Sequence, residues 1–423
     1  MELIITHMFQ NVNIVFQYWS DMSKKIINIT AKLDRFVLKN RMVSAALLAM
    51  QQTLPLLAIC VYAQLISQLI LSPNALFVTL FNWRLRIPAT FQLQEMLSLL
   101  EVFVLMILAA TFTKQYLSIR QVTNTVLPTL TNFLGTYFLF LGKGQTPTYD
   151  TSQYLLVILL SFISCESFYF YQKFISRDNP QPFAIRFLIW AGFVLLIDVS
   201  LHFAIQRSVV RSALSTLLSN NFFTTFIGLV IVSIVAPLLW WLGIGLPHEL
   251  INNPSTINAV IKNLDTILTN TNATLPYPTN LYSVYTAFSL FGGVGSTLAI
   301  SFILLFSVRK KRQHLGMLSL LPSLFNSNQL LYFGLPIFLR PLLLVPMIMT
   351  SLLGTLIGYT AIVTHLIKPA TLSTPNTTPS SLIGFLGSND SWSLLITTII
   401  FALSVIIYRP FIAIETSEVS YEK

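Results

Sequence analysis

The sequence contains little charge, and this scarcity excludes an ordinary soluble protein. Only 9% of its residues are Asp, Glu, Lys or Arg, against roughly 25% in a soluble domain, whereas 54% are hydrophobic and the mean hydropathy is +0.71. It has two cysteines, Cys60 and Cys165, each inside an apolar stretch, so neither a disulfide framework nor a metal site is indicated. The N-terminus lacks the charged, apolar and cleavage regions of a signal peptide, so it is expected to stay on the protein. What remains is the composition of a polytopic membrane protein.

The net charge of +10 has two readings. A basic chain could bind nucleic acid, but the Lys and Arg residues lie between apolar segments, as the positive-inside rule expects. One basic cluster, residues 24–41, precedes the first apolar span, and another, Arg309–Arg312, follows the seventh. We therefore expect no nucleic-acid partner, and we expect both clusters to face the cytoplasm. Docking to a cytoplasmic partner or anionic lipid is the alternative for Arg309–Arg312.

Long apolar segments divide the chain into membrane spans. They cover residues 44–71, 97–113, 122–142, 153–172, 187–205, 222–246, 282–308, 342–363 and 381–408. Seven of these spans lie between the two basic clusters that are expected to be cytoplasmic. Because an even number of crossings must separate them, a further crossing is predicted in the weaker stretch 71–93. The prediction is an all-α membrane protein of about ten transmembrane helices, with both termini in the cytoplasm.

Two regions do not read as ordinary spans. Residues 320–341 place Asn326, Ser327, Asn328 and Gln329 between apolar flanks that contain Pro and Gly. Hydrocarbon cannot satisfy amide hydrogen bonds, so we predict a re-entrant hairpin whose amides face a cavity or a polar ligand, with sugar as the first candidate. Residues 240–250 end an apolar span in glycines and then reach His248 and Glu249, which also suggests a pore-lining turn.

Several short strings in the C-terminal half resemble one transporter family. The strings are Phe291-Gly-Gly-Val-Gly-Ser-Thr-Leu, Leu315-Gly-Met-Leu-Ser-Leu-Leu-Pro-Ser-Leu-Phe-Asn, Phe333-Gly-Leu-Pro-Ile, Asn376-Thr-Thr-Pro and Gly384-Phe-Leu. Their order and spacing over 220–412 are similar to the membrane component (enzyme II C) of the lactose/cellobiose/diacetylchitobiose phosphotransferase systems. The N-terminal half resembles the family only in hydropathy and in Gln52-Thr-Leu-Pro55.

The resemblance implies a homodimeric permease in a bacterial plasma membrane. Its parts would be an N-terminal amphipathic segment (1–43), scaffold helices (44–205), a sugar-binding transport domain (206–412) and a cytoplasmic tail (413–423). A disaccharide such as cellobiose or chitobiose would be held at mid-membrane and phosphorylated by a separate cytoplasmic B component. The membrane component itself would hold no cofactor, no metal and no catalytic group of its own.

The departures from the family pattern fall on the expected sugar site. Gln329 stands where the family has a carboxylate, so hydrogen bonding survives but general-base chemistry does not. Gly245 replaces a histidine, and His248 is the nearest imidazole. Asn376, beside Thr377, replaces an aromatic residue on which a sugar ring would stack.

Each of these residues also has a structural interpretation. Gln329 either binds ligand or caps a broken helix, and His248 with Glu249 either replaces the missing histidine or is solvated surface. Asp198 and His202 share a helix face and form a proton relay, form a structural pair, or lie near the membrane interface. The chain is therefore expected to be either a sugar permease with impaired coupled phosphorylation, or a relative that no longer transports and acts as a sugar sensor or scaffold.

Overall fold

The computed structural model describes residues 24–71, 90–122, 124–140, 153–175, 183–206, 221–244, 254–269, 274–374 and 378–418. The elements within these ranges are helices, and no strand occurs among them. The all-α class expected from the sequence is thus confirmed. Residues 72–89, which contain most of the predicted extra crossing, lie outside the described part.

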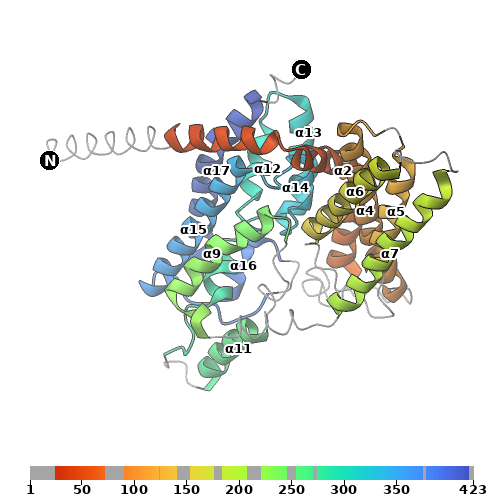
Figure 1. The fold of residues 1–423 in the computed structure, drawn as a ribbon. Coiled ribbons are helices and arrows are strands. Elements are labelled where there is room, and N and C mark those ends of the chain that lie inside the picture. Colours follow the sequence, from red (N-terminus) through yellow and green to blue (C-terminus); the bar gives the residue numbers. More distant parts are fainter. Residues whose placement is uncertain are drawn as a thin grey trace.

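A first group of helices is formed by the N-terminal half and lies together on one side of the molecule (Figure 1). It consists of α2 (Arg41–Ile66) with its π-helical extension η1 (Ser67–Leu71), α4 (Thr90–Ile119), α5 (Val126–Phe140), α6 (Tyr154–Ile175) and α7 (Phe183–Gln206). Helix α2 begins at Asn40, whose side chain accepts a hydrogen bond from the Met42 amide and so caps the helix.

The second group is made by the C-terminal half and is more broken. Its members are η2 (Asn221–Thr224), α9 (Phe226–Trp241), η3 (Leu281–Thr286), α12 (Leu298–Leu305), α13 (Lys310–Leu324), α14 (Gln329–Gly334), α15 (Pro341–Val363), α16 (Ser380–Ser388) and α17 (Trp392–Glu418). Helix α11 (Pro254–Thr269) extends from one end of this group (Figure 1). The helix of residues 24–38 crosses the opposite end.

Five helices in the described part are long and apolar enough to cross a membrane. They contain Arg41–Ile70, Met96–Ile119, Tyr154–Lys173, Pro341–Val363 and Trp392–Ile414, and three shorter apolar helices cover Val126–Phe140, Phe187–Phe203 and Phe226–Trp241. These eight segments fall where the sequence predicts spans. The many buried hydroxyls bond to carbonyls of their own helices, as Thr53 does to Ala49, which satisfies them without water.

Two predicted spans are interrupted and do not form single continuous helices. In 282–308 the chain leaves the helix after η3 and passes through a loop in which Gly292, Gly293 and Gly295 have positive φ. Glycine adopts this conformation without the clash of a Cβ atom, and the loop replaces the helix. In 381–408 the break comes at Asn389, whose φ of 51° ends α16 before α17 begins.

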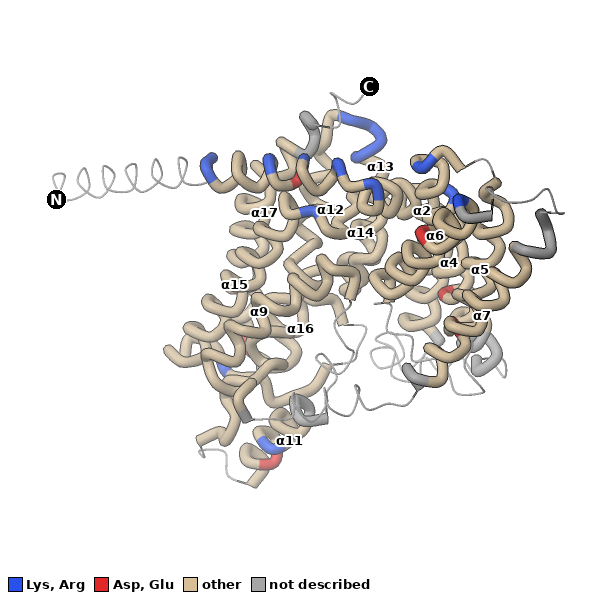
Figure 2. Tube along the Cα trace, viewed as in Figure 1, with Lys and Arg blue, Asp and Glu red and all other residues tan. Residues whose placement is uncertain are grey.

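Positive charge is concentrated at one end of the molecule. Figure 2 shows Lys and Arg along the helix of residues 24–38, at the start of α13 and at the neighbouring ends of the first group. The two basic clusters therefore lie at the same end, as their shared orientation requires.

The two helix groups meet along the broken helices of the second group. The Tyr62 hydroxyl of α2 donates to the Leu318 carbonyl of α13 at 2.8 Å. The Leu155 amide of α6 bonds to the Gly243 carbonyl at 3.3 Å, and the Leu339 amide bonds to the Trp241 carbonyl at 3.1 Å. These contacts hold the segment that follows α9 between α6 and the residues that follow α14.

Candidate functional site

The segment 320–341 is a helix–turn–helix break rather than a continuous helix. Helix α13 ends at Leu324, and the amides of Asn326 and Ser327 bond back to the carbonyls of Ser323 and Pro322 at 3.1 and 2.9 Å. Asn326 then adopts φ of 65°, a left-handed conformation that Asn tolerates better than most residues. This turn delivers Asn328 and Gln329 to the start of α14, so the local amide-rich sequence itself makes the break.

The two predicted amides are buried in protein and do not face lipid. Asn328 is 5% exposed and Gln329 is 9% exposed. The Asn328 side chain packs against the backbone of Gly293, where an added Cβ would stand 2.8 Å from the Asn328 Cγ and Nδ2 atoms. Its Nδ2 has no hydrogen-bond partner, although a buried amide normally has one.

The glycine loop beside Asn328 is fastened by hydroxyl groups from three other elements. The Gly292 amide donates to the Ser380 Oγ of α16 at 3.2 Å. The Gly295 carbonyl accepts from the Thr350 hydroxyl of α15 at 2.9 Å and from the Tyr408 hydroxyl of α17. The loop therefore has a defined position against α14, and its backbone approaches Asn328 because no Cβ intervenes.

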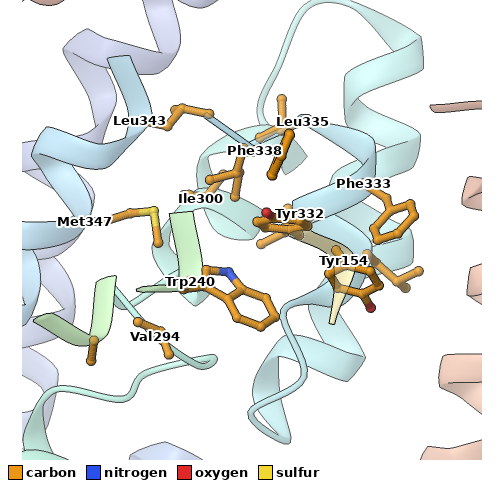
Figure 3. Close-up of a cluster of buried hydrophobic side chains, with 14 of the residues drawn as sticks. Tyr154, Trp240, Val294, Ile300, Tyr332, Phe333, Leu335, Phe338, Leu343 and Met347 are labelled. Carbon is orange, nitrogen blue, oxygen red and sulfur yellow. The ribbon is translucent and has the colours of Figure 1, made fainter. Parts of the chain in front are cut away.

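An aromatic cluster surrounds Tyr332 of α14 (Figure 3). Tyr332 stacks on Tyr154 of α6 with ring centroids 5.7 Å apart and contacts Trp240 of α9 at 5.0 Å. Phe333 meets Tyr154 edge-on at 5.0 Å. The Tyr332 hydroxyl and the Trp240 indole Nε1 are buried without a hydrogen-bond partner. Sequence reasoning missed Tyr332, although it lies one helical turn after Asn328 and Gln329.

Unpartnered buried polar atoms are concentrated in the second group. Those in the segment 283–378, apart from Arg312 and the neighbouring Tyr285 and Ser351, belong to Ser283, Thr286, Asn326, Asn328, Tyr332 and Thr378. Each such atom costs about 1–3 kcal/mol when it is left without a partner. Donors and acceptors of this neutral kind match the hydroxyl groups of a carbohydrate.

The same region contains no acid. Between Asp265 and Asp390 the sequence has neither Asp nor Glu. Asp390 accepts hydrogen bonds from the Lys368 and Trp392 amides, so it serves the turn before α17. This absence of acidic residues could be read from the sequence alone.

Four predicted site residues lie outside the described part of the chain. They are Gly245, His248, Asn376 and Thr377. The described residues that follow Thr377 do reach this region, because Ser380 bonds to the glycine loop and Thr378 is fully buried with an unpartnered Oγ1. The described geometry thus joins Asn328 to Gly293 and joins the loop of Gly293 to the segment that begins at Thr378.

Asp198 and His202 of the first group do not pair with each other. His202 donates from Nδ1 to the Leu139 carbonyl at 2.7 Å, and no Asp198–His202 ion pair occurs in the described chain. Asp198 instead lines a cavity of about 10 Å³ beside Asn132, Thr136 and Ser161, which has room for about one water molecule. Asp198 and His202 therefore contact different partners, because their neighbours lie on different turns of α5.

Comparison with known proteins gives consistent matches. Residues 98–351 match the family model described as "Phosphotransferase system, EIIC". The PTS system cellobiose-specific EIIC component of Lactococcus lactis subsp. lactis (strain IL1403) is 35% identical over 128 residues, 30% of this chain and 26% of that protein. The PTS system cellobiose-specific EIIC component of Geobacillus stearothermophilus is 29% identical over 192 residues, 44% of this chain and 42% of that protein. The aligned regions span less than half of these relatives.

A solved structure also resembles the chain along most of its length. It is the transporter ChbC, the IIC component from the N,N'-diacetylchitobiose-specific phosphotransferase system, at 22% identity and a TM-score of 0.43. The alignment covers 93% of this chain and 98% of that one. Because the family model spans more than half of the sequence, the chain belongs to the EIIC family of the phosphotransferase system.

Proposed function

We propose that this protein is a sugar-binding membrane permease of the phosphotransferase type that takes a β-linked disaccharide and is impaired in coupled phosphorylation. The observation that supports the proposal best is the buried, unpartnered Nδ2 of Asn328, which lies at the hairpin break against the Gly293 backbone. A hydroxyl-rich ligand would supply the missing partner at a site that excludes lipid.

The impairment follows from the chemistry of the available groups. Gln329 offers an amide where a base would be needed, and an amide does not accept a proton at neutral pH. No carboxylate is present between Asp265 and Asp390 to act as a base in place of Gln329. Binding and translocation require only hydrogen bonds and a movable lobe, so these functions survive the loss.

The wider assembly is proposed by analogy with the family. The second helix group would act as the transport domain with a re-entrant hairpin at 320–341, and the first group would be the scaffold of a homodimer. The end of the molecule with most of the Lys and Arg residues (Figure 2) would face the cytoplasm of a bacterium, where a B component would dock. Both termini would be cytoplasmic.

Calorimetry on the purified protein with cellobiose and with chitobiose tests the binding. Neutral hydrogen bonds contribute about 0.5–1.5 kcal/mol each, so a few of them, less the cost of ordering the sugar, give a dissociation constant of roughly 1 mM. The Asn328→Ala and Gln329→Ala variants should weaken this binding further. A low-micromolar constant that is lost in Gln329→Ala would contradict the impaired site and indicate an ordinary permease.

A sugar sensor or scaffold that no longer transports is the second candidate, supported by the missing carboxylate. Uptake of a labelled β-linked disaccharide by cells that lack other permeases distinguishes the two functions. Uptake that depends on Asn328 supports the permease, and binding without uptake supports the sensor.

A further inference from the structure

The helix of residues 24–38 has three distinct faces. At about 100° per residue, one face holds Ile27, Thr30, Ala31 and Asp34, which are all buried. The second face holds exposed apolar residues, and the third holds exposed basic residues. A helix that only linked a tail to α2 would need no such division.

The first face is docked on the second helix group. Ile27 and Ala31 pack with Leu342 of α15 and Phe411 of α17. Asp34 is fully buried and accepts hydrogen bonds from Nη2 and Nε of Arg340 at 2.7 and 3.1 Å. This ion pair lies at the start of α15 and fixes the rotation of the helix about its axis, so the other two faces point in set directions.

The second face is apolar and is exposed in the part of the chain that the structure describes. Ile26, Ile29, Leu33 and Phe36 are 37%, 52%, 50% and 76% exposed. Their spacing of three and four residues places them on one side of the helix. In Figure 1 this helix crosses one end of the second helix group. The ends of membrane-spanning helices are where headgroups meet acyl chains.

The third face is basic and borders the apolar one. Lys25 and Lys32 are exposed on it, and the exposed Lys39 follows in the turn before α2. Figure 2 shows that this helix lies at the end of the molecule where Lys and Arg gather. The apolar face next to the lysines is what a bilayer surface with anionic headgroups would contact.

We propose that the helix of residues 24–38 is a binding element for anionic phospholipid, held on the second helix group by the Asp34–Arg340 pair. Ile29, Leu33 and Phe36 enter the boundary between headgroups and acyl chains, and Lys25 and Lys32 contact the phosphates. A bilayer is the occupant, because the exposed apolar face belongs to a helix that packs on α15 and α17, two membrane-spanning helices, and the adjacent charge is positive. This element is independent of the sugar site.

The thermal stability of the full chain in neutral detergent, measured with different added lipids, tests whether Lys25 and Lys32 contact anionic headgroups. Phosphatidylglycerol should raise the melting temperature more than phosphatidylcholine does, and added salt should weaken the difference. A lysine near an anionic surface contributes a factor of about five, so Lys25→Gln/Lys32→Gln should require about 30-fold more phosphatidylglycerol for half of the effect. The matched control is Lys262→Gln/Lys368→Gln, which also removes two exposed lysines and should behave as the native chain does.

Spin labels test the apolar face in the same protein. Cys60 and Cys165 are buried, so a nitroxide label on Leu33→Cys or Phe36→Cys is selective. In nanodiscs these labels should be more accessible to oxygen than to a water-soluble nickel complex, and a label on Lys32→Cys should show the reverse. Equal stabilisation by the two lipids, an unchanged response in Lys25→Gln/Lys32→Gln, or aqueous labels at 33 and 36 would each overturn the proposal.

Discussion

The substitution Gly293→Ala tests the hairpin site by moving Asn328 without changing its chemistry. Gly293 has φ of 100°, so any residue with a Cβ is strained there, and the new atom would stand 2.8 Å from the Asn328 amide. Backbone strain of this kind costs roughly 1–3 kcal/mol. We expect the free energy of unfolding to fall by that amount. If Asn328 binds sugar, displacing it should also remove about 0.5–1.5 kcal/mol of binding, which is roughly a 2- to 10-fold weaker affinity.

Denaturant titration in mixed micelles measures the stability, and calorimetry with cellobiose measures the binding. The matched control is Gly192→Ala, because Gly192 is exposed on α7 and a Cβ there would meet nothing within 4 Å. That change should stabilise the helix by about 0.5–1 kcal/mol and leave the affinity unaltered. If both alanine variants behave alike, then the packing of Gly293 against Asn328 does not organise the site.

Three further predictions concern individual contacts. Asp34→Asn removes the carboxylate that pairs with the buried Arg340 guanidinium and should lower the free energy of unfolding by about 3–5 kcal/mol. The double variant Asp34→Asn/Arg340→Met should recover most of this lost stability. Equal losses in the single and double variants would refute a buried pair. Gln329→Glu should not restore phosphorylation of cellobiose by a phosphorylated B component, since Gly245 supplies no imidazole and Asn376 supplies no aromatic ring. Strong transfer of labelled phosphate in this variant would show that Gly245 and Asn376 are harmless. Asn132→Ala should lower stability by about 1–3 kcal/mol because it breaks the 2.7 Å bond to Thr113, whereas Asp198→Asn should not, and thermal unfolding of both variants checks the contrast.

The hairpin amides illustrate what could be read from the chain. Asn328 and Gln329 were predictable because an amide inside apolar sequence needs a polar partner wherever the chain folds. The aromatic cluster around Tyr332 was not, since Tyr154 and Trp240 come from helices far away in the sequence and aromatic residues are common in membrane spans.

The sequence by itself determined the class, the positions of most helices and the shared end of the two basic clusters, because hydropathy and charge act locally through the solvent. Only the tertiary structure decided which residues are neighbours. It placed Asp34 on Arg340, 306 residues away, and it separated Asp198 from His202, four residues apart. Partner choice in a low-dielectric interior depends on which helices pack together, and that packing is a property of the whole chain rather than of any segment.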